Sequence, residues 1–125
     1  MKPFLITGLP RTRTAWWSVA TTGPWSICLH EPSALCNSLP ELIALWDRPD
    51  VAYSGISDSA LIFQMKPIME TVKPRTLLIK RDVDEVQASL VQAFKAYTIN
   101  EAAGLAYVKE CAAQFERWEK HPLVK

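Results

Sequence analysis

The sequence lacks most of the features that would assign it to a specialised class of protein. Its 125 residues include only three cysteines, with no CxxC pair, which argues against a disulfide framework or a zinc site. The formal net charge of +1 provides no overall field for nucleic acid or a membrane surface. No apolar run is long enough for a signal peptide or a membrane span. We therefore expect one cytoplasmic domain over residues 1–125, with no metal, nucleic-acid or membrane partner.

Short apolar segments alternate with helical stretches along the chain. Strands are predicted at residues 4–7, 26–30, 51–54 and 76–80, and the last of these, "TLLIK", is nearly all apolar, as in strands buried on both faces of a parallel sheet. Helices are predicted at residues 14–21, 39–46, 59–72, 83–97 and 100–120. This order predicts an α/β fold of three layers, in which helices flank a mostly parallel sheet of about four strands through right-handed crossovers.

Three local patterns refine the predicted helices. Pro67 must bend or break the helix over residues 59–72. Asp82 and Glu85 have the spacing of a capping box at the start of the next helix. Apolar residues recur at helical spacing in the last helix, which predicts a stripe that lies on the sheet: Leu105, Val108, Ala112, Phe115 and Trp118.

Polar residues follow each predicted strand. In parallel sheets, ligands bind beyond the carboxyl ends of the strands, so these residues are expected on one rim. They are Arg11, Thr12, Arg13 and Thr14 after the first strand, His30 and Glu31 at the second, Ser57 and Asp58 after the third, and Arg81 after the fourth.

The loop after the first strand, "GLPRTRT", has the composition of an anion site. The helix that follows offers unpaired N–H groups and its positive dipole end, while the threonine hydroxyls and arginines add charged hydrogen bonds. The loop departs from the nucleotide-hydrolase P-loop GxxxxGK[ST], because Arg13 stands at the second glycine and Thr14 at the lysine. Hydrolysis of ATP or GTP is therefore disfavoured. The alternative interpretation is a basic turn with solvated arginines.

A second segment, "RDVDEVQAS", places Arg81 at the end of a buried strand and Ser89 eight residues later on a helix. A phosphate beside this helix could bind both side chains. Each residue alone has a plainer interpretation, since Ser89 could bond to its own helical turn and Arg81 could form a salt bridge on the rim.

Together the two segments resemble the P-loop sulfotransferases, which use 3′-phosphoadenylyl sulfate (PAPS) and have a P-loop NTPase-like core. "LPRTRTAW" is similar to that family's 5′-phosphosulfate loop, written YPKSGTTW or PRSGTTL. The resemblance implies that PAPS contacts two sets of residues, which are Pro10, Arg11, Thr12, Arg13, Thr14, Ala15 and Trp16 at the 5′-phosphosulfate, and Arg81 and Ser89 at the 3′-phosphate.

Three departures from the family pattern accompany the resemblance. Arg13 replaces a glycine, Ala15 replaces the second threonine, and the chain has no C-terminal glycine-rich basic segment. These departures leave two alternatives to the enzyme, which are a non-catalytic anion-binding module and a degenerate P-loop phosphotransferase of the kinase type.

The resemblance implies transfer of a sulfuryl group from PAPS to a hydroxyl or amine of a small molecule or glycan. Arg11 would stabilise the leaving phosphate, and a carboxylate or imidazole would accept the proton. Neighbouring side chains on a strand point to opposite faces, so only one of His30 and Glu31 is expected at the site. We favour Glu31 as the base, with His30 as the second candidate. Glu31 could instead cap a helix or pair with a loop arginine. Ser57 or Asp58 could contact the acceptor or cap a helix. A homodimer is compatible with so short a scaffold.

Overall fold

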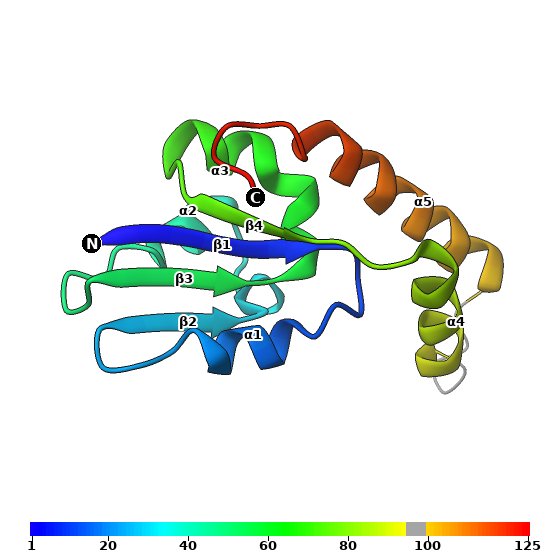
Figure 1. Cartoon of the computed structure of the whole chain (residues 1–125), viewed down its shortest axis with the longest axis horizontal. Helices are drawn as coiled ribbons and strands as arrows, with labels where there is room; N and C mark the ends of the chain where they lie inside the picture. The colour runs from blue at the N-terminus through cyan, green and yellow to red at the C-terminus, as the bar shows by residue number, and fades with distance from the viewer. Residues whose placement is uncertain (95–99) are drawn as a thin grey trace.

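The computed structural model describes residues 1–94 and 100–125, and its centre is a sheet of four parallel strands (Figure 1). The order across the sheet is β2-β3-β1-β4, and all three pairings are parallel. The strands are β1 (Lys2–Gly8), β2 (Ser26–His30), β3 (Tyr53–Ser57) and β4 (Arg75–Ile79). The number and direction of the strands are as the sequence predicted.

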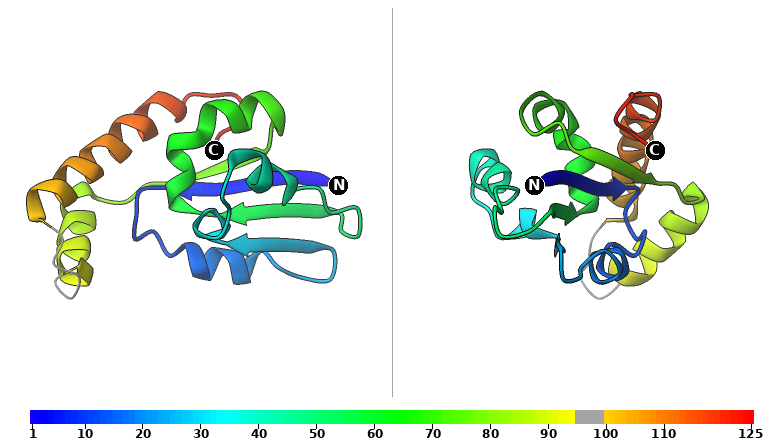
Figure 2. Two further views of the ribbon diagram at one scale, coloured as in Figure 1. Left: turned by 180° about the vertical axis from the view of Figure 1, so that it is seen from behind. Right: turned by 60° about the vertical axis from the view of Figure 1, so that its left-hand side comes forward.

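Helices connect the strands and cover the sheet, with α1 on one side and α2 and α3 on the other (Figure 2). The α/β fold is therefore confirmed. The helical segments are α1 (Thr14–Ala20), the 3-10 turn η1 (Pro32–Ala34), α2 (Leu39–Ala44), the 3-10 helix η2 (Ser59–Gln64), α3 (Met65–Thr71), α4 (Val83–Phe94) and α5 (Glu101–Trp118). Within the described ranges, none of these helices is both long and apolar enough to cross a bilayer. Residues 95–97 of the helix predicted over 83–97 lie outside the described residues.

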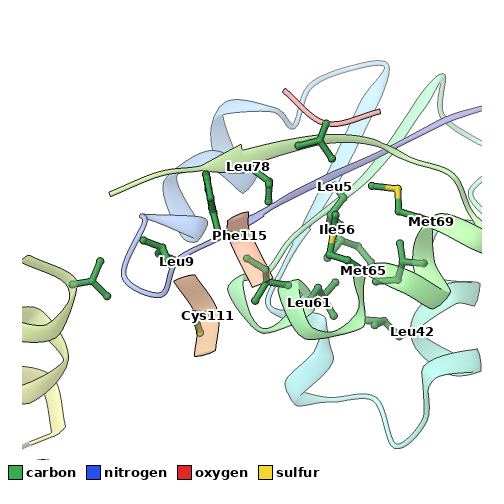
Figure 3. Packing of buried hydrophobic residues seen from close by; sticks show 14 of the residues in the cluster. Leu5, Leu9, Leu42, Ile56, Leu61, Met65, Met69, Leu78, Cys111 and Phe115 are labelled. Atoms are coloured by element: carbon green, nitrogen blue, oxygen red, sulfur yellow. The ribbon is translucent and has the colours of Figure 1, made fainter. Parts of the chain in front are cut away.

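The main hydrophobic core lies on the face of the sheet covered by α2, η2 and α3 (Figure 3). Leu5 of β1 and Ile56 of β3 are fully buried there, against Leu61 and Met65. Burying each such side chain contributes about 1.5–3 kcal/mol relative to leaving it exposed. Trp46 closes the same cluster, and its indole N–H donates to the backbone oxygen of Phe4 (3.0 Å).

The prediction of the third strand at residues 51–54 is wrong, because β3 runs from Tyr53 to Ser57. Glycine and serine have low strand propensity, and the sequence "SGIS" therefore gave a weak signal. The register with β1 places Gly55 beside Phe4, and the Phe4 ring occupies the space that a Cβ at Gly55 would take. Tertiary packing thus extends the strand through residues that local preference places after it.

The helix predicted over residues 59–72 is broken, as the proline suggested. It consists of η2 followed by α3, and the change falls at Met65 rather than at Pro67 itself. Pro67 lies in the first turn of α3, where the N–H that proline lacks has no partner within the helix.

The start of α4 confirms half of the predicted capping box. Oδ1 of Asp82 accepts the N–H of Glu85 (3.0 Å), but the carboxylate of Glu85 turns to Arg81. In α5, the buried residues are Val108, Cys111 and Phe115, and the helix packs against α4 and η2. Leu105, the first residue of the predicted stripe, is 37% exposed.

The last residues of the chain pair with the free edge of β4. The N–H of Thr76 donates to Leu123 (2.8 Å), and Thr76 and Leu78 exchange two further bonds with Lys125. This pairing covers a strand edge that would otherwise expose unpaired backbone groups.

We expect Lys73→Gly to stabilise the protein. Lys73 follows α3 with φ 53°, in the left-handed region, where a side chain costs about 1–2 kcal/mol. Glycine loses about 0.5–1 kcal/mol more chain entropy, so the free energy of unfolding should rise by about 0.5–1 kcal/mol in urea denaturation. Lys109→Gly, on the exposed face of α5, is the control and should lower it by about 1 kcal/mol. A decrease in the free energy of unfolding in both variants would contradict the proposed strain at Lys73.

The three thiols should differ in reactivity. Cys28 and Cys111 are buried, and burial raises the pKa of both thiols, that of Cys111 to about 11. Cys36 is half-buried. We therefore expect one rapidly reacting thiol in the native protein near neutral pH, three in denaturant, and none in native Cys36→Ser, as measured with an aromatic disulfide reagent. Three rapid thiols in the native protein would be incompatible with this packing.

Candidate anion-binding site

The carboxyl ends of β1, β2 and β4 meet at one end of the sheet, from which α4 and α5 extend (Figure 1). The strand register aligns them, because Ser57 at the end of β3 lies opposite both Ile6 and His30. On the other side of β1, Gly8 lies opposite Ile79. The polar segments that follow the strands are therefore neighbours, as expected for a ligand site in a parallel sheet.

The loop after β1 exposes its charges and buries its hydroxyls. Arg11 and Arg13 are exposed, with left-handed φ values of 63° and 60°, whereas Thr12 and Thr14 are buried. Thr12 is only 5% exposed, and its hydroxyl has no hydrogen-bond partner within the part of the chain described. Gly8 is required at the loop's start, because its φ is 148° and a Cβ there would collide with the backbone of Ile79.

The structure brings the two sulfotransferase-like segments into direct contact. The Nη1 of Arg81 donates to the backbone oxygen of Arg11 (2.8 Å), and the Nε of Arg11 donates to the hydroxyl of Ser89 on α4 (3.1 Å). These pairs are separated by 70 and 78 residues in the sequence. Ser89 thus bonds to the loop rather than to its own helical turn.

Arg81 also forms a salt bridge on the rim, which was the alternative role predicted for it from the sequence. Its Nε lies 3.3 Å from Oε2 of Glu85, one helical turn further along. Exposed pairs at this spacing contribute only about 0.3–0.5 kcal/mol, so the contact orients the guanidinium more than it stabilises the fold. Sequence reasoning missed this role of Glu85, although the i,i+4 spacing of the two charges was visible.

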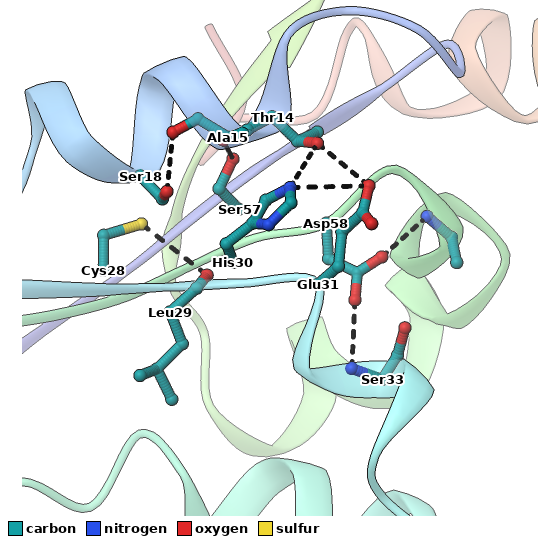
Figure 4. Close-up of polar contacts among 11 residues, drawn as sticks. Thr14, Ala15, Ser18, Cys28, Leu29, His30, Glu31, Ser33, Ser57 and Asp58 are labelled. Carbon is teal, nitrogen blue, oxygen red and sulfur yellow. Dashed lines mark hydrogen bonds and ion pairs between the residues drawn. The ribbon is translucent and has the colours of Figure 1, made fainter.

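His30 and Glu31 both reach Thr14 (Figure 4), so the prediction that only one of them faces the site is wrong. Oγ1 of Thr14 lies 3.1 Å from Nε2 of His30 and donates to Oε1 of Glu31 at 3.0 Å. The alternation of strand side chains ends at His30, because Glu31 has φ 45° and ψ 45°, in the left-handed region. This turn brings the carboxylate back toward the imidazole, 3.6 Å from Nε2.

Ser57 and Asp58 are buried and hold the segments around the site together (Figure 4). The hydroxyl of Ser57 donates to the backbone oxygen of Thr14 (2.8 Å), which fixes the start of α1 to β3. The carboxylate of Asp58 caps η2 by accepting the N–H of Ala60 (3.0 Å) and also accepts the N–H of Ser33 (3.1 Å). The predicted cap is confirmed, and the second bond anchors the turn that carries Glu31. A contact of either residue with an acceptor stays a prediction.

The remaining residues of the predicted loop differ in exposure. Pro10 is buried, Ala15 is exposed on α1, and Trp16 is 58% exposed with its ring edge-on to Trp17 at 4.8 Å. The exposed ring of Trp16, three residues after Arg13 in the sequence, is available for stacking.

Two cavities lie near α4. One of about 410 Å³ borders Arg81 and combines apolar and charged walls, lined by Leu9, Lys80, Val83, Ala112, Phe115, Glu116, Glu119 and Lys120. The other, of about 800 Å³, lies between α4 and α5, and the charged residues among its described lining are the acidic Asp84 and Glu101. The smaller cavity is the better match for an anion, because its lining includes three cationic side chains, those of Lys80, Arg81 and Lys120.

Nothing in the comparisons with known proteins assigns this site. No protein-family model matches the chain, and a search of curated proteins finds no significant match. Among residues 1–94 and 100–125, no three histidine, cysteine or acidic side chains are grouped as a metal site requires. The resemblance to sulfotransferases therefore depends on the two segments and on their contact.

Asp58→Ala should destabilise the protein strongly. It removes a buried carboxylate that accepts the N–H groups of Ala60 and Ser33, and we expect a loss of about 2–3 kcal/mol in the free energy of unfolding by urea denaturation. Asp82→Ala removes the exposed cap of α4 and is the matched control, with an expected loss of about 1 kcal/mol. Equal losses would show that Asp58 acts only as a cap and does not anchor the Glu31 turn.

Proposed function

We propose that the chain binds the nucleotide PAPS and transfers its sulfuryl group to a hydroxyl or amine of an acceptor. The observation that carries this proposal is the contact between the two arginine segments, Arg81 to the backbone of Arg11 and Arg11 to Ser89. A nucleotide with phosphates at its 3′ and 5′ ends needs two cationic patches a few ångströms apart. The contact between segments 70 residues apart in sequence supports the proposal, because it puts both arginines within reach of one nucleotide.

The loop fits a phosphosulfate in three respects. Arg11 and Arg13 present their guanidinium groups to solvent, where they can bind oxygen atoms in bidentate fashion. Thr12 has a hydroxyl with no partner in the described chain, so a bound oxygen would satisfy it. Arg13, which replaces a family glycine, has φ 60°, the backbone conformation that glycine adopts readily. The substitution therefore preserves the course of the loop.

The residues around Thr14 supply the remaining chemistry. PAPS, when bound, provides an activated sulfuryl group whose leaving group is a phosphate. Arg11 would stabilise the charge that develops on that phosphate, and Glu31 would accept the proton that the acceptor loses as its bond to sulfur forms. Both side chains lie at the end of the sheet where the two segments meet.

The class of acceptor and the cellular compartment are further parts of the proposal. We propose a small molecule or a glycan as acceptor, because the half-exposed Glu31 is accessible from solvent. Three free cysteines suit the reducing conditions of the cytoplasm.

Thermal unfolding with ligands tests this function. Adenosine 3′,5′-bisphosphate should raise the melting temperature more than adenosine 5′-monophosphate, which lacks the 3′-phosphate, and more than ATP with magnesium. Arg81→Ala should weaken bisphosphate binding about tenfold to hundredfold, as expected for the loss of about 1.5–3 kcal/mol from a charged hydrogen bond. Arg75→Ala, at the opposite end of β4, is the control and should leave the affinity unchanged.

Three outcomes would count against the proposal. Equal stabilisation by all three nucleotides would indicate an unspecific anion site. Magnesium-dependent turnover of ATP would favour the phosphotransferase alternative. Specific bisphosphate binding without transfer to any acceptor would favour the non-catalytic module.

A further inference from the structure

Two side chains, those of His30 and Glu31, converge on the hydroxyl of Thr14 at the end of the sheet (Figure 4). Oγ1 of Thr14 lies 3.1 Å from Nε2 of His30 and 3.0 Å from Oε1 of Glu31. Thr14 is buried, while the side chains of His30 and Glu31 are 40% and 49% exposed. Because Thr14 follows Arg13 directly, the cluster joins the anion loop to the end of β2.

The number of protons in the cluster fixes the direction of its hydrogen bonds. A threonine hydroxyl has one proton, and an ionised carboxylate can only accept, so the bond to Glu31 uses the proton of Thr14. The oxygen of Thr14 can then only accept from His30, which requires the imidazole proton to be on Nε2. If Thr14 donated to His30 instead, the oxygens of Thr14 and Glu31 would lie 3.0 Å apart with no proton between them.

We propose that His30 is a positioning residue: its Nε2–H donates to Thr14 and thereby commits the single Thr14 proton to Glu31. The lone pair of the His30 ring then lies on Nδ1, away from Thr14. Glu31 is left as the group that accepts a proton at the site. The identity of the molecule that gives this proton rests on the proposed function, but the direction of the hydrogen bonds does not.

The arrangement couples the anion loop to Glu31. Ser57 holds the backbone of Thr14, because its hydroxyl donates to the Thr14 carbonyl at 2.8 Å. The backbone therefore stays in place while the Thr14 hydroxyl can rotate and donate its hydrogen bond to a different acceptor. An anionic oxygen bound at the loop can accept the Thr14 hydrogen bond in place of Glu31. Oε1 of Glu31 is then free to accept a proton from another molecule. His30 continues to donate to Thr14 in both arrangements.

Long-range ¹H–¹⁵N NMR of the free protein in mildly alkaline solution tests the direction of the bonds. His121 is an internal reference, because its Nδ1 accepts the N–H of Leu123 (3.3 Å) and its proton is therefore on Nε2. We expect His30 to show the same single tautomer, to become a mixture in Thr14→Val, and to return to one tautomer in Thr14→Ser. A proton on Nδ1 of His30, or a tautomer unaffected by Thr14→Val in a folded variant, overturns the proposal.

Rates of sulfuryl transfer separate positioning from proton transfer. Glu31→Gln should lower kcat about hundredfold or more with little change in KM, because it removes the proton acceptor. His30→Gln keeps an N–H that can donate to Thr14 and should stay within about tenfold of the parent, whereas His30→Ala should lose more. Equal losses in the two His30 variants would overturn the positioning role.

The two proposals can fail separately. If adenosine 3′,5′-bisphosphate does not bind while the tautomer of His30 depends on Thr14 as expected, the proposed function fails and the positioning role of His30 stands.

Discussion

The placement of β1 between β3 and β4 determines which residues can meet at the site. The loop after β1 has the end of β4 on one side, with Arg81, and the ends of β3 and β2 on the other, with Ser57, His30 and Glu31. Parallel pairing puts all four carboxyl ends at the same edge. A strand order that moved β1 to an edge would separate the arginine contact from the Thr14 cluster.

Backbone strain is concentrated at this edge. Of the four described non-glycine residues with left-handed φ values, three are Arg11, Arg13 and Glu31. Each costs about 1–2 kcal/mol, and burial of the hydrophobic core on the face of the sheet covered by α2, η2 and α3 offsets that cost. Strain at Arg11 and Arg13 turns their charges to solvent, and strain at Glu31 turns its carboxylate back to Thr14. The unfavourable conformations therefore occur where they place charged side chains.

Buried polar residues support the strained turns. Asp58 joins the turn after β2 to η2, and Ser57 joins α1 to β3. These bonds involve backbone groups, so they fix the path of the chain and leave the side chains of the site able to change partners. The contact between Arg11 and Ser89, in contrast, is exposed and joins two side chains. The site therefore combines a fixed backbone with side-chain bonds that can exchange, as the proposed anion binding would need.

The sequence alone determined the order of helices and strands, because apolar periodicity and helix caps such as Asp82 are local. It also determined that polar residues follow the strands, since Arg11, Glu31 and Arg81 come directly after apolar runs. It did not determine the bounds of β3, where packing of Gly55 against Phe4 overrides weak local preference.

Only the tertiary structure decided how the site residues meet. The contact of Arg11 with Ser89 depends on where α4 lies relative to the first loop, and no local pattern encodes that distance. The alternation rule assigned His30 and Glu31 to opposite faces, and a single left-handed residue reversed it. The residue types and the ends of the strands can be predicted from local sequence. The direction of each side chain and its hydrogen-bond partners are determined only when the strands pair and the helices pack.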